Sequence, residues 1–431
     1  MSYYFIGIKG SGMSSLAQIM YDLGYKVLGS DVEKYFFTQI ELEKRNILLL
    51  NYNSNNINNN LIIVKGNSIK DDNVELIKSK SLNLKIYTYF EMLNEIINKH
   101  YSIGISGCHG KTTTTALLSK VFEKVGTNYL IGDGTGFANK KNKNFIFEAC
   151  EYKRHFLNYF PNVSIITNIE LDHYDYYKSL KDLKKAYIDY LNQNKKYVML
   201  NGDDKNVLSI LKDLKVKYYL YGIKNTNDFF VKNIKYKTDS TSFDFYYNNK
   251  LLTRINTKFF GKHMVYNTLS AISVGFLENI SLDNIQDSLF NFKNAKRRFN
   301  EIKTKTNIII DDYAHHPTEI KAVINSVKQK YKDKKIIGVF LPHTFSRTKA
   351  LYKKIAKELN RVDKSYIFDI YKSREKQEDY IGVTSNLILD LLNNKERFNI
   401  ELLKKEKNSV IIFMSPDDMK EYIEVLKQED L

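Results

Sequence analysis

Residues 101–115, YSIGISGCHGKTTTT, decide the fold that we expect for this chain. An apolar stretch typical of a β-strand leads into GCHGKT at residues 107–112, and a helical pattern follows. In this setting glycines let backbone N–H groups surround phosphate oxygens, and the lysine reaches the outer phosphates. The stretch therefore predicts a phosphate loop that binds ATP, with a threonine hydroxyl on Mg²⁺. The predicted ATP-binding residues are Gly107, Cys108, His109, Gly110, Lys111, Thr112 and Thr113.

Alternating strand and helix patterns surround this loop and predict an α/β fold with parallel sheets. Only residues 216–260 differ, because their short β-type runs and an Asn248-Asn249 hairpin turn indicate antiparallel strands. In the last part of the chain, Pro317 is expected to open a helix from its first turn. We predict three domains: a Rossmann-like domain at residues 1–97, a P-loop ATPase-like domain with a small antiparallel β part at 98–295, and a second Rossmann-like domain at 296–431.

The composition is ordinary for a soluble globular protein. The net charge of +17 is spread along amphipathic helices, which favours solvated faces over a nucleic-acid site. No apolar run reaches about 18 residues, so we expect no membrane span. The N-terminus lacks the pattern of a signal peptide, and two cysteines give no disulfide framework. These features predict a cytoplasmic protein.

A second glycine turn lies near the N-terminus, at residues 7–14, GIKGSGMS, between a strand and a helix. Taken alone, this turn indicates only a dinucleotide-like site. Asp31, at the end of the next strand, would suit a ribose of NAD as readily as one of UDP.

One departure in the phosphate loop is informative. Ile105 stands where the common loop has its early glycine, and the compact form that remains resembles the Mur ligase family, which adds amino acids to peptidoglycan precursors. For the central domain the resemblance implies that Glu151 and His173 bind Mg²⁺ together with Thr112. Nearby alternatives are Glu148, Asn168 and Asp172.

The same resemblance assigns the rest of the nucleotide site. His263 and Asn267, in GKHMVYNTLSAISV, match the residues that contact adenine, although many members have Asn where Met264 stands. Arg298, in KRRF, would approach the phosphates of ATP, because a guanidinium suits dispersed negative charge. Asp312 would hold the ribose.

In the last domain, DDYAHHPTE and LPHTFSRT resemble the branch of the family that acts on UDP-N-acetylmuramate. Tyr313 and His315 would face the reacting groups, and Arg347 would pair with the carboxylate of the incoming L-alanine. Many members have an additional Arg where Thr344 stands. A metal site at His315 and His316 is disfavoured, since paired helical ligands are usually four residues apart.

In the first domain, the resemblance implies that the glycine turn holds the UDP pyrophosphate. The residues expected to bind the UDP-linked substrate there are Gly10, Ser11, Gly12, Met13, Ser14, Asp31, Gly66 and Asn67, with Ser68 beside them.

The expected reaction joins L-alanine to the lactyl carboxylate of UDP-N-acetylmuramate through an acyl phosphate, with ATP and Mg²⁺. Catalytic roles fall to Lys111, Glu151, His173, Arg298, His315 and Arg347. The resemblance places this step in cell-wall synthesis, and with it cell shape and division, in a monomer or homodimer.

Two alternatives remain open: a ligase that joins a recycled peptide to the same nucleotide sugar, and a non-catalytic nucleotide- or nucleic-acid-binding protein. Cys108 and Cys150 are expected to be small residues that fill tight positions. The alternative hypothesis is that Lys111 and a helix start lower the pKa of Cys108 and make it reactive.

Overall fold

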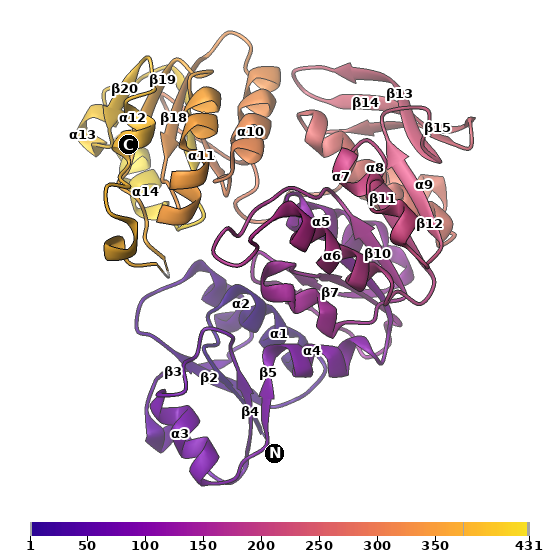
Figure 1. The fold of residues 1–431 in the computed structure, drawn as a ribbon, viewed down its shortest axis with the longest axis vertical. Helices are drawn as coiled ribbons and strands as arrows, with labels where there is room; N and C mark the ends of the chain where they lie inside the picture. Colours follow the sequence, from indigo (N-terminus) through magenta and orange to yellow (C-terminus); the bar gives the residue numbers. More distant parts are fainter. Residues whose placement is uncertain (1, 374, 429–431) are drawn as a thin grey trace.

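The computed structural model describes residues 2–373 and 375–428, which contain three β-sheets that follow one another along the chain (Figure 1). The predicted three-part α/β fold is confirmed. Among the described residues no helix is long and apolar enough to cross a membrane.

The first sheet is fully parallel, with the strand order β3-β2-β1-β4-β5. This is the order of a Rossmann-type half, in which ligands bind beyond the carboxyl ends of the strands where the order reverses, here between β1 and β4. The glycine turn lies at that point. The elements are β1 (Ser2–Ile6), α1 (Ser11–Asp22), β2 (Val27–Asp31), α2 (Ile40–Glu43), β3 (Leu48–Asn51), β4 (Leu61–Lys65), α3 (Val74–Ser81), β5 (Ile86–Thr88) and α4 (Tyr89–Ile97).

The second sheet has ten strands in the order β15-β14-β13-β12-β11-β10-β6-β9-β7-β8. Strand β6 leads into the phosphate loop and lies between β9 and β10, so the segments after these two strands flank the loop. The elements are β6 (Tyr101–Ser106), α5 (Lys111–Val121), β7 (Thr127–Ile131), β8 (Thr135–Phe137), β9 (Asn144–Glu148), β10 (Val163–Ile166), α6 (Leu180–Leu191), β11 (Tyr197–Asn201), α7 (Lys205–Leu208), β12 (Tyr218–Gly222), β13 (Phe229–Tyr236), β14 (Thr241–Tyr247), β15 (Lys250–Thr257), α8 (Lys262–Leu277) and α9 (Leu282–Phe290).

The predicted antiparallel part consists of β13, β14 and β15, and Figure 1 shows it beside α10 of the last unit. It is not separate, because β13 pairs with β12 and so extends the parallel sheet. The hairpin turn is confirmed: Asn248 and Asn249 have positive φ angles of 46° and 63°, as a tight two-residue turn requires.

The third sheet has the order β16-β17-β21-β18-β19-β20, with only β16 antiparallel. Pro317 occupies the first turn of α10, as predicted. The elements are β16 (Asn300–Lys303), β17 (Ile308–Asp312), α10 (Pro317–Lys330), β18 (Lys335–Phe340), α11 (Phe345–Leu359), β19 (Lys364–Ile367), α12 (Asn386–Leu389), β20 (Lys395–Arg397), α13 (Ile400–Leu403), β21 (Ser409–Met414) and α14 (Lys420–Gln428).

The three units pack against one another around the ends of these strands. Helix α1 docks on the central unit through Gln18, whose side chain donates to Gly134 O at 2.7 Å. Helix α10 docks on the antiparallel strands through Gln329, which accepts from Gly261 N at 2.7 Å and donates to Lys237 O at 2.9 Å. The carboxyl ends of all three sheets thereby contribute residues to shared cavities.

Candidate active site

The phosphate loop turns on two glycines that no other residue replaces without strain. Gly107 has φ +132°, and a Cβ there would lie 2.0 Å from Thr167 Oγ1. Gly110 has φ +83° and caps α5, where a Cβ would lie 2.8 Å from Asn267 Oδ1. Asn168 braces the loop from β10, since its Oδ1 accepts from His109 N at 3.0 Å. The loop is therefore rigid, with backbone groups at the start of a helix.

Lys111 begins α5 and is held inside this loop. Its Nζ donates to Gly107 O at 2.6 Å and lies 3.0 Å from Glu151 Oε2. Burial alone would lower the pKa of Lys111, but Glu151 raises it above its usual value. Burial likewise opposes ionisation of Glu151, yet Lys111 and His173 lower its pKa to about 2. Both groups are charged at neutral pH.

The predicted Mg²⁺ ligands have different hydrogen-bond and ion-pair partners. Thr112 Oγ1 donates to Glu148 Oε2 at 2.8 Å, so the alternative carboxylate Glu148, rather than Glu151, lies beside the hydroxyl. Glu151 instead lies 3.3 Å from His173 Nε2. Burial raises the pKa of Glu148, and Lys111 only partly offsets this. A divalent cation would suit such an incompletely compensated carboxylate.

The hypothesis of a reactive Cys108 is wrong in its premise. The thiol is buried, and burial raises its pKa well above the usual value, an effect that Lys111 does not overcome. Its Sγ donates to Glu170 O at 2.7 Å. Burial and Glu151 also raise the pKa of Cys150, to about 12. Both thiols stay protonated and fill space beside the loop.

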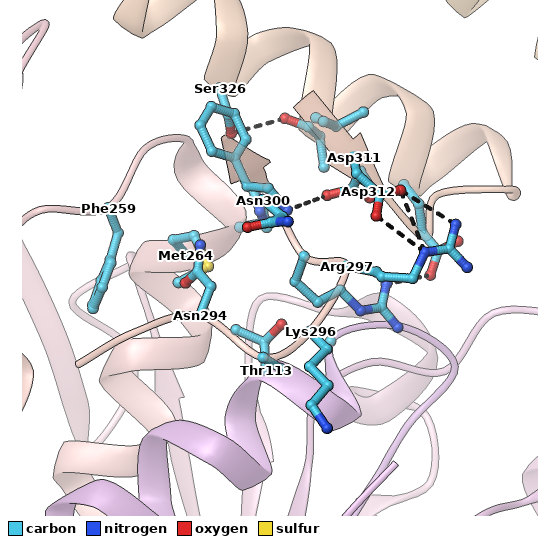
Figure 2. A pocket seen from close by; sticks show the side chains of 18 of the residues that line it. Thr113, Phe259, Met264, Asn294, Lys296, Arg297, Asn300, Asp311, Asp312 and Ser326 are labelled. Atoms are coloured by element: carbon cyan, nitrogen blue, oxygen red, sulfur yellow. Dashed lines mark hydrogen bonds and ion pairs between the residues drawn. The ribbon is translucent and has the colours of Figure 1, made fainter. Parts of the chain in front are cut away.

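A cavity of about 1000 Å³ lies between α8, the segment after α9, and α10. The predicted adenine residues His263 and Asn267 line it, together with Met264 and Phe259. Figure 2 shows Phe259 and Met264 at one end and Arg297 with the two aspartates of β17 at the other. Burial and Arg298 lower the pKa of His263 to about 4, so its ring is neutral. An apolar end and a charged end suit a nucleotide.

The two arginines of KRRF divide their roles. Arg297 is 6% exposed and braces the third unit from within, donating to Asp311 and to Ser415 O at 2.7 Å. Arg298 borders both cavities, as predicted for a phosphate contact. Asp312, the predicted ribose residue, lines the larger cavity, and burial raises its pKa to about 6. Its carboxylate already accepts from Phe299 N at 2.8 Å and from Ala314 N at 2.9 Å.

A second cavity, of about 600 Å³, runs from the N-terminal glycine turn past Lys111 to the third unit. Of the predicted UDP-site residues, Gly10, Ser11 and Asp31 line it, as does Ser68. The others are placed differently. Met13 and Ser14 have buried side chains, Gly12 and Gly66 lie at tight backbone approaches, and Asn67 is exposed.

Arg347 reaches this cavity from the start of α11, but its guanidinium is already engaged. Two of its nitrogens donate to Asp172 Oδ1, at 3.2 and 3.1 Å, and NH1 lies 3.1 Å from His343 Nδ1. Arg347 lowers the pKa of Asp172 below its usual range against the effect of burial. Thr344 is the buried N-cap of α11, with φ +66°. No motif predicted that Asp172 would pair with this arginine.

Tyr313 and His315 lie where β17 ends, on the wall of the second cavity. The guanidinium carbon of Arg298 lies 4.9 Å from the centroid of the Tyr313 ring. Burial lowers the pKa of His315 to about 4. A neutral His315 facing the cavity is able to accept a proton.

A cluster that we did not predict joins the phosphate loop to the third unit. The His109 ring lies between two carboxylates, with Nε2 3.3 Å from Glu170 Oε2 and Nδ1 3.4 Å from Glu319 Oε1. The His316 ring is 4.5 Å away, centroid to centroid. The only sequence signal was the glutamate in DDYAHHPTE, which also has the spacing of a helix-capping residue.

Three family models match the chain in order. They are described as the Mur ligase family catalytic domain, over residues 2–101, the Mur ligase middle domain, over 105–275, and the Mur ligase glutamate ligase domain, over 297–431.

Two relatives of the chain have the same enzyme name. A UDP-N-acetylmuramate–L-alanine ligase of Lactiplantibacillus plantarum is 42% identical over 99% of this chain and 98% of its own length. A ligase of the same name from Ligilactobacillus salivarius is 42% identical over 98% and 95%.

Solved structures share the whole fold. A UDP-N-acetylmuramate–alanine ligase of Thermotoga maritima has a TM-score of 0.83 at 22% identity, covering 100% of this chain and 99% of the other. A murein peptide ligase of Psychrobacter arcticus has a TM-score of 0.72 at 19% identity, covering 99% and 98%.

Proposed function

The chain belongs to the Mur ligase family, and on that premise we propose that it joins L-alanine to UDP-N-acetylmuramate in peptidoglycan synthesis. Members of this family are ATP-dependent ligases, so ATP supplies the energy. The observation that carries the proposal is the full-length identity of 42% to ligases of that name. The two adjoining cavities, which share Gly110, Arg298 and Glu319 as lining residues, support it.

In the proposed reaction the lactyl carboxylate attacks the γ-phosphate of ATP, ADP leaves, and an acyl phosphate forms. The amine of L-alanine then attacks the acyl carbon, loses a proton, and phosphate leaves. Because two anions must meet in the first step, Lys111 and Arg298 neutralise charge at the junction of the cavities. In the second step His315, whose neutral ring lines the second cavity, is the proposed acceptor of the amine proton.

We propose that Mg²⁺ is held by Thr112 and Glu148, with Glu151 and His173 as a second carboxylate–histidine pair. The fit rests on two features: burial raises the pKa of the Glu148 carboxyl, which Lys111 only partly offsets, and His173 Nδ1 is buried without a hydrogen bond among the described residues. Mg²⁺ would add positive charge between the phosphates. The substitution Glu148→Gln should therefore raise the Mg²⁺ concentration needed for half-maximal activity more than Glu151→Gln does.

Arg347 is the proposed partner of the alanine carboxylate, and Asp172 holds its guanidinium ready. The test of acceptor identity is phosphate release with ATP, UDP-N-acetylmuramate and one amino acid at a time. Release should depend on the nucleotide sugar and be fastest with L-alanine. A faster rate with a tripeptide would instead favour the peptide-recycling reaction.

Other features remain predictions: domain boundaries at residues 97/98 and 295/296, a cytoplasmic location, and a monomer or homodimer without a nucleic-acid partner.

A further inference from the structure

One carboxylate of α10, that of Glu319, contacts side chains from three segments around the site. Its Oε1 lies 3.4 Å from Nδ1 of His109 and 3.9 Å from NH1 of Arg298. Its Oε2 lies 3.3 Å from Nδ1 of His315 and accepts from the backbone N–H groups of His315 and His316 at 3.1 and 3.3 Å. These partners belong to the phosphate loop, the segment after α9 and the end of β17.

Glu319 is buried and anionic. Its side chain is 13% exposed. Burial would raise the pKa of this carboxyl, but His315, His109 and Arg298 together hold it well below its usual range. The negative charge is therefore permanent at neutral pH and acts at short range in a poorly solvated site.

In the phosphate loop, the charge of Glu319 acts on His109. Although burial lowers its pKa, Glu170 and Glu319 raise the pKa to about 9, so the ring is a cation at neutral pH. The other titratable groups that act on His109 are Asp172, which favours the cation, and His316, which is packed against it. His109 is thus a charged link between the loop and α10.

We propose that Glu319 is a positioning residue: its charge holds His109, Arg298 and His315 in their working places once the third unit docks on the phosphate loop. In this arrangement one side chain, that of Glu319, aligns two parts of the site. They are the loop that holds the outer phosphates of ATP and the residues that face the acyl group. This inference rests on the proposed function, because it assigns Glu319 a part in the ligation reaction.

A purely structural role is the competing explanation, since Glu319 forms a capping box with His316 at the start of α10. Glutamine can serve the same capping position, because its side-chain oxygen still accepts backbone N–H groups. The variant Glu319→Gln therefore removes the charge and keeps the cap.

The matched control is Glu91→Gln, which changes the same capping-box position of α4, on an exposed part of the first unit. Each protein is measured for kcat, for KM of ATP and of UDP-N-acetylmuramate, for Tm, and for the His109 pKa by NMR of labelled histidine. We expect E319Q to lose kcat by roughly 10²-fold, as for a misplacement of about 1 Å. Its KM for UDP-N-acetylmuramate and its Tm should stay close to wild type.

The His109 pKa should fall from about 9 in E319Q and stay unchanged in E91Q. The double variant H109Q/E319Q should be scarcely slower than the slower single variant, because the two residues act as one unit. Wild-type kcat in E319Q would overturn the proposal. So would an unchanged His109 pKa together with a Tm that falls as far as in Glu319→Ala. If the wild-type protein does not ligate, the proposed function fails instead, and the NMR result still reports on the contact.

Discussion

Two segments of this chain share one local design, a strand, a glycine turn and a helix. They are the turn at residues 7–14 and the phosphate loop at residues 107–112. Gly7 and Gly110 have nearly the same positive φ, +84° and +83°. What surrounds them differs. The first turn is braced by Asp31, whose Oδ2 accepts from Lys9 N at 2.7 Å, and the Lys9 ammonium donates to backbone oxygens. In the second, the Lys111 ammonium lies 3.0 Å from the Glu151 carboxylate.

The comparison teaches that a glycine turn marks a place for phosphate, while the titratable groups around it decide whether chemistry follows. A turn whose lysine donates to backbone oxygens should only bind, and its loss should appear in KM. A turn whose lysine pairs with a buried carboxylate should control kcat.

The largest expected effect is that of Lys111→Ala. The lysine is the loop residue expected to contact the γ-phosphate, so its loss should lower kcat by at least about 10³-fold. Far-UV circular dichroism should show that the fold is retained, because Glu151 keeps its contact with His173. Lys120→Ala, on the same helix and paired with Glu123, is the control and should leave phosphate release unchanged. Near-normal ligation by K111A would remove the distinction between the two turns.

Arg347→Lys tests the third unit, which contributes neither glycine turn. Lysine keeps the charge but loses the planar pair of donors, so KM for L-alanine should rise roughly 10- to 100-fold. KM for UDP-N-acetylmuramate should not change. Arg361→Lys, which disturbs only a contact with Glu358 and Asn325, is the matched control. An unchanged KM for L-alanine would exclude Arg347 as the carboxylate partner.

Gly7→Ala tests the binding turn. Alanine at φ +84° costs about 1–2 kcal/mol, and its Cβ would lie 3.0 Å from the Ile69 side chain. We expect KM for UDP-N-acetylmuramate to rise about tenfold, because 1.4 kcal/mol corresponds to that factor. Saturating substrate should restore kcat. A fall in kcat under those conditions would show that this turn takes part in chemistry.

The smallest expected effect is a pH dependence of docking through His109. Because its folded pKa is raised to about 9, the stability that it contributes is complete below the unfolded value of about 6.5 and is lost as pH rises through about 9. The Tm difference between wild type and His109→Gln should therefore shrink over that range. A difference that stays constant or grows with pH would contradict a protonated His109.

Local sequence patterns predicted much of the fold. The succession of strands and helices along the chain, the hairpin at Asn248 and the helix start at Pro317 follow from periodicity and turn chemistry. These are properties of neighbours in sequence. Short strands such as β8 and β20 were missed, because three residues show no periodicity. The continuity of β13 with the parallel sheet depends on long-range pairing.

The site was predicted less completely, for tertiary reasons. The sequence could not show that Glu148, rather than Glu151, lies beside Thr112, since the chain between β9 and β10 leaves regular structure, with positive φ at Lys153 and Arg154. Cys108 has the local setting of a reactive thiol, but its burial, which no motif reports, reverses the pKa shift. The pairing of Arg347 with Asp172 joins residues 175 positions apart.

The most direct test of chemistry at Lys111 follows the oxygen atoms. UDP-N-acetylmuramate labelled with oxygen-18 in its lactyl carboxylate is incubated with ATP, L-alanine and the protein, and the released phosphate is examined by mass spectrometry. Attack of the carboxylate on the γ-phosphate predicts one labelled oxygen in each phosphate released, and none in phosphate formed by simple ATP hydrolysis. Product formation with unlabelled phosphate would contradict an acyl phosphate at this site.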